Sequence, residues 1–319
     1  MLISDTDAEE LLAETRERDP DFVGHYMENY KVTTSTGEPV LLRYARRDVF
    51  HGYDARMLTE ADALGAAMAR GVQVPELLYR GEDFLIERYI PGLQPEVNSA
   101  DQLTWVPMLL TEVEKAQKRP AYYSNLRSVY DWQQWLRAFL ANLYSTLPAT
   151  HMERVALLGI PPLDRVWKPD SAQSNRALTL VHSDLHPSNL LVNSTGVWIL
   201  DWELAMIADP LWDAAVALHR TPWPTADAER WAAELWLAMH RADDRDVERL
   251  AEYRKLEVWK SLLVDSARYP AAVAEDPECL SHRARRLHAL LEAGADAFGC
   301  ESLPLARVRE LLSQWAIVT

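Results

Sequence analysis

The hydrophobic and polar positions of the chain follow one pattern before residue 92 and another after it. Between residues 21 and 92, two runs rich in β-branched, aromatic and aliphatic residues, 30–36 and 39–45, are joined by the turn residues Thr-Gly-Glu. Short runs of this composition on either side of a glycine-containing turn are typical of a β-hairpin. The pattern therefore predicts two adjacent antiparallel strands near the start of the chain.

A helix and two further strands are predicted after this hairpin. Met57, Ala61, Leu64 and Met68 recur at helical spacing within residues 54–71, and the glycine that ends this stretch suits a helix C-terminus. Residues 74–92 read as two strands around a turn, which end at Pro-Gly. The predicted order is strand, strand, helix, strand, strand.

The remaining elements are mainly helical. An acidic helix at about residues 5–18 opens the chain, with Thr6 and Glu9 spaced as a capping box. Short β-like runs interrupt the second part of the chain at 178–182, 189–192 and 197–200. Amphipathic helical segments are predicted near residues 101–118, 128–147, 224–241, 247–268, 280–297 and 303–316.

These patterns predict an α+β protein of two lobes. The first, residues 1–91, is small and β-rich, and the second, residues 92–319, is large and mainly helical, with Pro91-Gly92 as a candidate hinge. The hydrophobic content of 48% and charged content of 25% are ordinary for a folded protein of this length. Cys279 and Cys300 are too few for a disulfide framework, so we expect free thiols in or near helices.

The net charge of −15 narrows the classes of partner. No local basic patch is evident, which argues against a nucleic acid or an anionic membrane as the main partner. A cationic small molecule suits the negative electrostatic potential of such a chain better, although solubility alone is the simpler explanation of the acidic composition. The chain shows no signal-peptide pattern and no apolar run of membrane-spanning length, so we expect a cytoplasmic protein. The oligomeric state stays open.

The stretch from His182 to Ala205, HSDLHPSNLLVNSTGVWILDWELA, carries the candidate chemistry. Its Ser-Asp-Leu-His start is similar to the Asp-x-His element of binuclear metallohydrolases. That reading requires further metal ligands in short loops, such as Gly-Asp-x-x-Asp and Gly-Asn-His-Asp/Glu, and neither string occurs in the chain. The metallohydrolase interpretation is therefore rejected.

Phosphoryl transfer explains the same stretch better. Asn189 follows Asp184 by five positions, and Asp201 follows a hairpin-like segment. One carboxylate can orient an attacking hydroxyl and accept its proton, while an amide oxygen and a second carboxylate hold Mg²⁺ on a nucleoside triphosphate. These three residues are the candidate catalytic base, Asp184, and the candidate metal ligands, Asn189 and Asp201.

Two strings in this region, VHSDLHPSNLLV and ILDWELAMIADPLWDAAVAL, resemble motifs of the aminoglycoside phosphotransferase and choline kinase superfamily, which has the protein-kinase-like fold. The resemblance implies that Asp184 is the base and that Asn189 and Asp201 bind the metal. It also implies that His182 supports the base and that Asp213 braces the catalytic loop from a following helix.

The same resemblance extends to the first lobe. Arg43 stands in the strand that carries the phosphate-binding cation, where a lysine is usual, and Glu60 on the following helix becomes its expected ion-pair partner. The nucleotide-covering loop departs from the family pattern, because it contains Gly24 but also His25, Tyr26 and Met27. Such a crowded loop presents few bare backbone amides to phosphates.

The expected donor is ATP or GTP, whose base would contact main-chain groups from Glu87 to Tyr89. Only eleven residues separate Asp201 from Asp213, which leaves no room for a peptide-docking segment, so a small hydroxylated molecule is the expected acceptor. An aminoglycoside or related antibiotic is the leading choice. Choline, ethanolamine, an amino acid or a sugar is the alternative, and a catalytically silent nucleotide-binding protein is the third. Trp202, Trp212 and Trp259 are candidates for an aromatic cage around a quaternary amine, although packing is the simpler role for them.

Overall fold

The computed structural model describes residues 3–16, 18–23, 27–46, 56–170, 174 and 176–317. The chain divides into two compact units. One contains Met1–Val129 and Asn175–Arg241, and the other contains Tyr130–Ser174 and Ala242–Thr319. The predicted lobe boundary at residues 91 and 92 falls inside the first unit and stays a prediction.

The first unit begins with helix α1 (Asp5–Thr15) and a five-stranded antiparallel sheet. The strand order is β1 (Phe22–Val23), β2 (Met27–Thr33), β3 (Pro39–Ala45), β5 (Phe84–Arg88) and β4 (Leu77–Arg80). Helix α2 (Glu60–Met68) lies between β3 and β4 in the chain. The predicted order of strand, strand, helix, strand and strand is therefore confirmed, with the two-residue β1 as an unpredicted addition.

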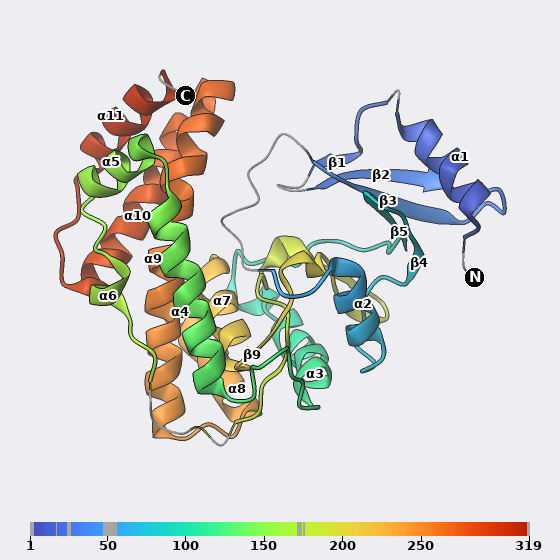
Figure 1. Ribbon diagram of the computed structural model, residues 1–319, viewed down its shortest axis with the longest axis horizontal. Coiled ribbons are helices and arrows are strands. Elements are labelled where there is room, and N and C mark those ends of the chain that lie inside the picture. Colours follow the sequence, from blue (N-terminus) through green and yellow to red (C-terminus); the bar gives the residue numbers. More distant parts are fainter. Residues whose placement is uncertain are drawn as a thin grey trace. The chain divides into compact units, whose positions relative to one another are not determined.

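Alternation along the strands gives the sheet two different faces. One face packs against α1, as Figure 1 shows, and its core includes Ala8, Leu11, Val32, Leu42 and Ile86. The opposite face carries Arg43, whose register partners are Asn29 and Leu85, and Leu41, two residues before Arg43, pairs with Glu87. One face is thus committed to the hydrophobic core, while the other presents polar groups.

The N-terminal cap of α1 differs from the prediction. Ser4 is the N-cap residue, and its hydroxyl oxygen accepts a hydrogen bond from the backbone amide of Asp7 at 3.2 Å. Its hydroxyl in turn donates to the Asp7 carboxylate at 2.6 Å. The predicted capping box at Thr6 and Glu9 is wrong because the first helical turn starts two residues earlier.

The rest of the first unit combines helices with two small antiparallel pairs. Helix α3 contacts β6 and β8, and α7 contacts α8. Strands β6 and β9 pair with each other, as do β7 and β8. Their bounds, with the short 3₁₀ helices η1 to η3, are η1 Ala100–Gln102, α3 Trp105–Gln117, β6 Thr179–Val181, η2 Pro187–Asn189, β7 Leu190–Asn193, β8 Gly196–Ile199, η3 Trp202–Leu204, β9 Met206–Ala208, α7 Leu211–Arg220 and α8 Ala226–Met239.

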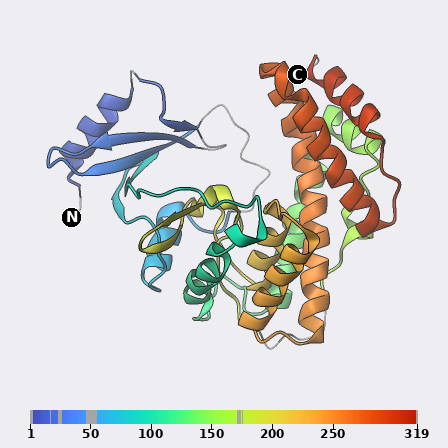
Figure 2. The same cartoon turned by 180° about the vertical axis from the view of Figure 1, so that it is seen from behind.

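The second unit is helical. Helix α9 is its longest element at 32 residues, and it packs against α10, α11 and α5; α9, α10 and α11 lie side by side in both views (Figures 1 and 2). Trp132 packs edge-on against Tyr253 at 5.5 Å between ring centroids, and both are fully buried. Its elements are α4 Val129–Thr146, α5 Ala149–Leu157, α6 Leu163–Val166, α9 Asp244–Glu275, η4 Pro277–Cys279, α10 Leu280–Phe298 and α11 Leu305–Ala316.

The hydrophobic pattern overlooked α5, α6 and β9, whereas α7 is the helix around Asp213 that the resemblance implied. None of the described helices has the length and apolar character needed to cross a bilayer.

Both cysteines are free thiols, as predicted, with Cys279 in η4 and Cys300 just after α10.

The connection after β5 is fastened to the β7–β8 hairpin. Leu93 and Val192 exchange backbone hydrogen bonds of 3.1 and 2.8 Å, and the Asn193 side-chain amide donates to the Pro91 carbonyl at 2.9 Å. A Cβ atom at Gly92 would lie 3.1 Å from both Leu191 Cβ and the Val192 carbonyl oxygen. The backbone at Gly92 therefore approaches the hairpin closely, which favours a residue without a side chain at position 92. The hinge at Pro91-Gly92 stays a prediction.

Candidate active site

The loop of residues 182–189, which contains the candidate base Asp184, is held by a carboxylate from α7. One Asp213 oxygen accepts from the Ser183 amide at 2.8 Å, and the other accepts from the His182 amide at 3.1 Å. The side-chain amide of Gln117 donates to the same carboxylate at 3.0 Å. Burial nevertheless raises the pKa of Asp213 to about 6, against the lowering effect of these three hydrogen bonds. The position matches the bracing role that the resemblance implied.

Ser183 adopts a left-handed backbone conformation, with φ of 67°. This conformation is uncommon for residues with a side chain. It lets the two consecutive amides of His182 and Ser183 point to one carboxylate, and it turns the following residue, Asp184, out of the β6 strand direction.

Asp184 lies among three polar side chains. Asn189 donates to its carboxylate at 3.2 Å and to its backbone carbonyl at 2.9 Å. Arg220, at the end of α7, and His186 approach the two carboxylate oxygens at 3.3 and 3.4 Å. Burial alone would raise the pKa of Asp184, but the Arg220 guanidinium and His186 hold it well below its usual value. Asp184 is therefore ionised and able to accept a hydrogen bond from a hydroxyl.

His182 links the loop of residues 182–189 to the segment that precedes Asp201. Its Nδ1 accepts from the Asp184 amide at 3.2 Å, and its Nε2 lies 2.7 Å from the Leu200 carbonyl oxygen. These two contacts assign the tautomer with hydrogen on Nε2. Burial lowers the pKa of His182, which keeps the ring neutral, and Trp202 packs edge-on against it at 4.9 Å. The geometry suits the supporting role predicted for His182.

Asn189 and Asp201 offer oxygen atoms of the kind that Mg²⁺ prefers. Because the Asn189 amide nitrogen faces Asp184, its carbonyl oxygen is directed away from that residue. One Asp201 oxygen contacts Arg43 at 2.7 Å. The Asp201 side chain remains 31% exposed, so its other oxygen can coordinate a metal ion. The donor set fits a magnesium ion that a nucleotide's phosphates would also ligate. Among the described residues, no group of three or more His, Cys, Asp and Glu side chains is arranged to hold a metal by itself.

Arg43 is the centre of a buried cluster on the polar face of the sheet. Its guanidinium contacts Glu60, Glu87 at 3.4 Å and Asp201 at 2.7 Å, and its Nε donates to Asn29 at 3.2 Å. The ion pair expected between Arg43 and Glu60 is thus present. Burial would lower the pKa of Arg43, but the three carboxylates raise it well above its usual value, so the cation is permanent.

In the segment from Glu87 to Tyr89, two backbone amides are engaged in hydrogen bonds. The amides of Arg88 and Tyr89 donate to the carbonyls of Glu76 at 2.9 Å and Pro39 at 3.4 Å, so these donors are used within the sheet region. The Lys31 ammonium nitrogen lies 4.1 Å from the centroid of the Tyr89 ring, in a cation–π contact. Contact of the base with these main-chain groups stays a prediction.

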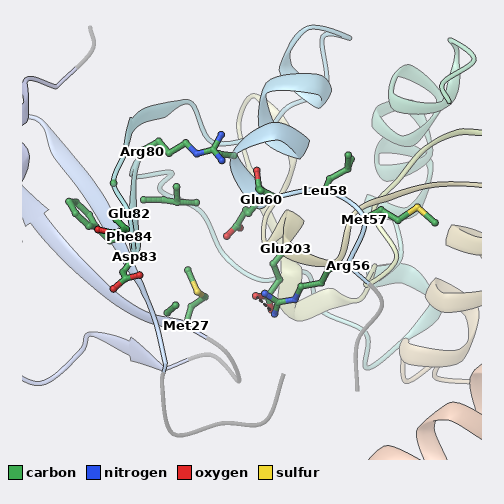
Figure 3. A pocket seen from close by; sticks show the side chains of 15 residues that line it. Met27, Arg56, Met57, Leu58, Glu60, Arg80, Glu82, Asp83, Phe84 and Glu203 are labelled. Atoms are coloured by element: carbon green, nitrogen blue, oxygen red, sulfur yellow. Dashed lines mark hydrogen bonds and ion pairs between the residues drawn. The ribbon is translucent and has the colours of Figure 1, made fainter. Parts of the chain in front are cut away.

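A cavity of about 560 Å³ lies beside the Arg43 cluster. Figure 3 shows Glu60 and Glu203 on one side of it and the β4–β5 turn, with Glu82 and Asp83, on the other. Arg56 contacts Glu203 at 3.2 Å, which ties the segment before α2 to η3. Arg43 of β3 also bridges the two regions, because it contacts both Glu60 at the start of α2 and Asp201.

Several residues of the site were missed from the sequence. Asn29, Gln117 and Arg220 each contact a predicted residue through a side chain. A signal existed for Arg220, which follows Asp213 by seven positions in α7 and so lies on the same helix face two turns later. Gly24, His25 and Tyr26 of the nucleotide-covering loop lie outside the described residues.

The tryptophans considered for an aromatic cage are packing residues. Trp202, Trp212 and Trp259 are 1%, 2% and 0% exposed, so none offers a ring face to a ligand. Trp202 and Trp259 also donate their indole N–H groups to the carbonyls of Ile199 and Pro161. The cage reading is therefore wrong for these three residues.

A family model described as the phosphotransferase enzyme family matches residues 23–253. No curated protein matches the chain in sequence. The matched range contains Arg43, Glu60, Asp184, Asn189, Asp201 and Asp213, so the site lies wholly within it.

Solved structures share the fold. A choline/ethanolamine kinase family protein from Mesorhizobium loti is 21% identical, with a TM-score of 0.52 and coverage of 94% of this chain and 95% of the other. A macrolide 2′-phosphotransferase from Brachybacterium faecium is 16% identical, with a TM-score of 0.53 and coverage of 94% and 100%. An amicoumacin kinase, in complex with AMP-PNP, Ca²⁺ and Ami, is 18% identical, with a TM-score of 0.54 and coverage of 98% and 97%. The protein-kinase-like fold predicted from the sequence is confirmed.

Proposed function

The chain belongs to the phosphotransferase enzyme family, and from this premise we propose that it is a Mg²⁺-dependent O-phosphotransferase for a small molecule. It would transfer the γ-phosphoryl group of ATP or GTP to a hydroxyl of the acceptor. The observation that carries the proposal is a pair of contacts within one folded unit. Asn189 is hydrogen-bonded to Asp184, and Arg43 forms an ion pair with Asp201.

Each residue has a distinct part in this reaction. Asp184 orients the acceptor hydroxyl and takes its proton as the oxygen bonds to phosphorus and the bond to the nucleoside diphosphate breaks. Asn189 and Asp201 would hold the metal, which supplies charge neutralisation at the phosphates. The Arg43 guanidinium has five N–H groups and uses four of them on Asn29, Glu60, Glu87 and Asp201. The remaining N–H can meet a phosphate oxygen.

The acceptor that we favour is an aminoglycoside or related antibiotic. The net charge of −15 supports a cationic acceptor, and two of the structural neighbours bear names of antibiotic-modifying enzymes. Choline or ethanolamine is the second candidate, favoured by the Mesorhizobium loti neighbour. The burial of Trp202, Trp212 and Trp259 weakens that candidate, because quaternary amines are usually held by open aromatic faces.

The test is a coupled assay for nucleoside diphosphate release over a panel of antibiotics, choline-like amines, amino acids and sugars, with ATP and GTP in parallel. Asp184→Asn should lower kcat on a confirmed acceptor by roughly 10²- to 10⁴-fold, because it removes the proton acceptor. Asp227→Asn, an exposed residue of α8 paired with Arg230, is the control and should behave as the parent. Equal rates for Asp184→Asn and the parent would refute the proposal, and nucleotide binding without turnover on any acceptor would favour a silent nucleotide-binding protein.

A further inference from the structure

Arg43 departs from the lysine that is usual in its strand, and its side chain is buried among partners from four segments. These segments are β2, α2, β5 and the residue that precedes η3, and they supply Asn29, Glu60, Glu87 and Asp201. Three of the four side chains are carboxylates. One buried positive charge therefore serves three acidic groups.

The N–H groups of the guanidinium are divided among these partners nitrogen by nitrogen. Nε donates its single hydrogen to Asn29 at 3.2 Å. Nη1 contacts both Glu60 and Glu87, the latter at 3.4 Å, which accounts for its two hydrogens. Nη2 contacts Asp201 at 2.7 Å and keeps one hydrogen unused within the described part of the chain. The spare donor is therefore on the nitrogen beside Asp201, the candidate metal ligand.

Glu87 is the partner that the sequence did not predict for Arg43. It is 2% exposed in β5, where its backbone pairs with Leu41 on one side and Leu77 on the other. Among the described residues, its side chain is hydrogen-bonded to Arg43 alone. Burial raises the pKa of Glu87 and the adjacent guanidinium opposes this effect, so the carboxylate depends on Arg43 for its charge. A cation at position 43 has to supply this carboxylate with a donor.

A lysine in this place would have too few donors. Its ammonium carries three N–H groups on one nitrogen, against five on three nitrogens in a guanidinium. Contacts with Glu60, Glu87 and Asp201 would use all three, and nothing would be left for a phosphate oxygen. A carboxylate released in favour of a phosphate would remain buried without a partner, which is strongly destabilising.

We infer that Glu87 is a positioning residue that makes arginine necessary at position 43 for the binding of phosphates. Its carboxylate takes one N–H group of the cation, and only a side chain with five such groups keeps a spare one beside Asp201. This inference rests on the proposed function, since the spare donor acts only on a nucleotide in the site. It also gives a physical reason for the departure from lysine at position 43.

A double-mutant cycle on Arg43→Lys and Glu87→Met tests the inference. Methionine is unbranched like glutamate and is only a weak acceptor, so it returns one donor to position 43. The measurement is isothermal titration of the purified protein with the Mg²⁺ complexes of AMP-PNP and GMP-PNP. Arg43→Lys should weaken the binding of the analogue that the parent binds by roughly 10- to 100-fold, because a hydrogen bond to a charged phosphate is lost.

Glu87→Met should act differently in the two backgrounds. With arginine at position 43 it should change Kd by at most about threefold, because Asn29, Glu60 and Asp201 still hold the guanidinium. With lysine there it should tighten binding by at least about tenfold, because one N–H group is released for the phosphates. The lost charge of Glu87 acts on the phosphates in both backgrounds, so the difference between the two effects isolates the competition for donors.

Glu76→Met is the matched control. The Glu76 side chain is 42% exposed and contacts Arg88 at 2.9 Å. This variant should have the same small effect on Kd in both backgrounds. If Glu87 merely stabilises the sheet, Glu87→Met shifts the thermal midpoint equally in both backgrounds and restores no affinity to Arg43→Lys.

The outcomes separate failure of the inference from failure of the proposed function. Unchanged affinity in Arg43→Lys, or equal effects of Glu87→Met in the two backgrounds, overturns the role of Glu87 and leaves the phosphotransferase function standing. If Arg43→Lys does not fold, the double variant decides. A folded double variant with Kd within about tenfold of the parent supports the inference, and one that fails to fold or to bind overturns it. Failure of the parent to bind either analogue overturns the proposed function, and the inference falls with it.

Discussion

At the scale of single residues, the site depends on carboxylates whose surroundings differ sharply. Asp184 is ionised beside Arg220, whereas Asp213 is deeply buried and binds neutral N–H donors. The pKa of the first is lowered and that of the second is raised to about 6. The two aspartates of one site should therefore titrate in different pH ranges, Asp184 below and Asp213 above the usual range of an aspartate.

The variant Arg220→Gln tests whether Arg220 lowers the pKa of Asp184. Loss of the guanidinium should raise the pKa of Asp184, so the acidic limb of the profile of kcat/KM against pH should move to higher pH. At alkaline pH, where Asp184 is ionised in both proteins, kcat/KM should stay within about tenfold of the parent. The measurement is a pH profile on a confirmed acceptor, with Arg230→Gln on α8 as the control. Superimposable acidic limbs for Arg220→Gln and the parent would show that Arg220 does not act on the base.

Asp213→Asn tests the buried carboxyl through stability. A pKa raised from 3.8 to about 6 means that the native state binds this proton more tightly than the unfolded state does. The stability that this proton confers is fully present below pH 3.8 and is lost as pH rises to about 6. Two pKa units correspond to about 3 kcal/mol in the free energy of unfolding.

Urea unfolding of the parent and of Asp213→Asn between pH 4 and pH 7 checks this prediction. The difference between their free energies of unfolding should change by up to about 3 kcal/mol across the window, in favour of the variant at the higher pH. Asp62→Asn, whose side chain is 57% exposed, should show no such change. A pH-independent difference between Asp213→Asn and the parent would contradict the raised pKa.

At the scale of elements, sequence periodicity served best where a strand or helix was long. The hairpin of β2 and β3 and helices such as α3, α10 and α11 have strong patterns, whereas β9 has three residues and α6 has four, too few for any period to show. The motif identified Asp184, Asn189 and Asp201 because they are close together in the chain. The contacts of Arg220 with Asp184 and of Glu87 with Arg43 join distant segments, which spacing alone does not reveal.

Gly92→Ala tests the close approach between the connection after β5 and the β7–β8 hairpin. The new Cβ would lie 3.1 Å from two atoms of the hairpin, one of them a backbone oxygen that cannot move freely. Overpacking of this kind costs about 1 to 3 kcal/mol, so Tm should fall by several degrees. Gly65→Ala in α2 is the matched control, since its Cβ would meet nothing within 4 Å. It should leave stability unchanged or raise it by up to about 1 kcal/mol, and an equal fall in both variants would contradict the prediction.

At the scale of the whole molecule, the net charge of −15 acts on any charged acceptor before contact. An acidic protein attracts cations over distances comparable to the Debye length, which is about 10 Å at 0.1 M salt. Arg220 beside Asp184 places a positive charge at the position proposed for the acceptor hydroxyl. The amino groups of a cationic acceptor should therefore bind away from Arg220 while the protein as a whole attracts them.

The salt dependence of kcat/KM tests this attraction. For a polycationic acceptor, kcat/KM should fall steadily between about 0.05 and 0.5 M NaCl, since screening weakens long-range steering. A neutral hydroxylated acceptor serves as the control and should show little change. Parallel behaviour of the two acceptors would remove net charge as a reason to expect a cationic substrate.

The backbone hydrogen bonds that attach the β7–β8 hairpin to distant segments determine how this region opens in the native state. Leu93 is hydrogen-bonded to Val192, and the Ile199 amide donates to the Gln73 carbonyl at 2.9 Å, so the hairpin is bound on both strands to segments far away in the chain. Breaking one attachment exposes the other to solvent, which couples their opening. The amide hydrogens of Leu93, Val192 and Ile199 should exchange with deuterium at a common rate, as one cooperative unit whose ends carry Asn189 and Asp201.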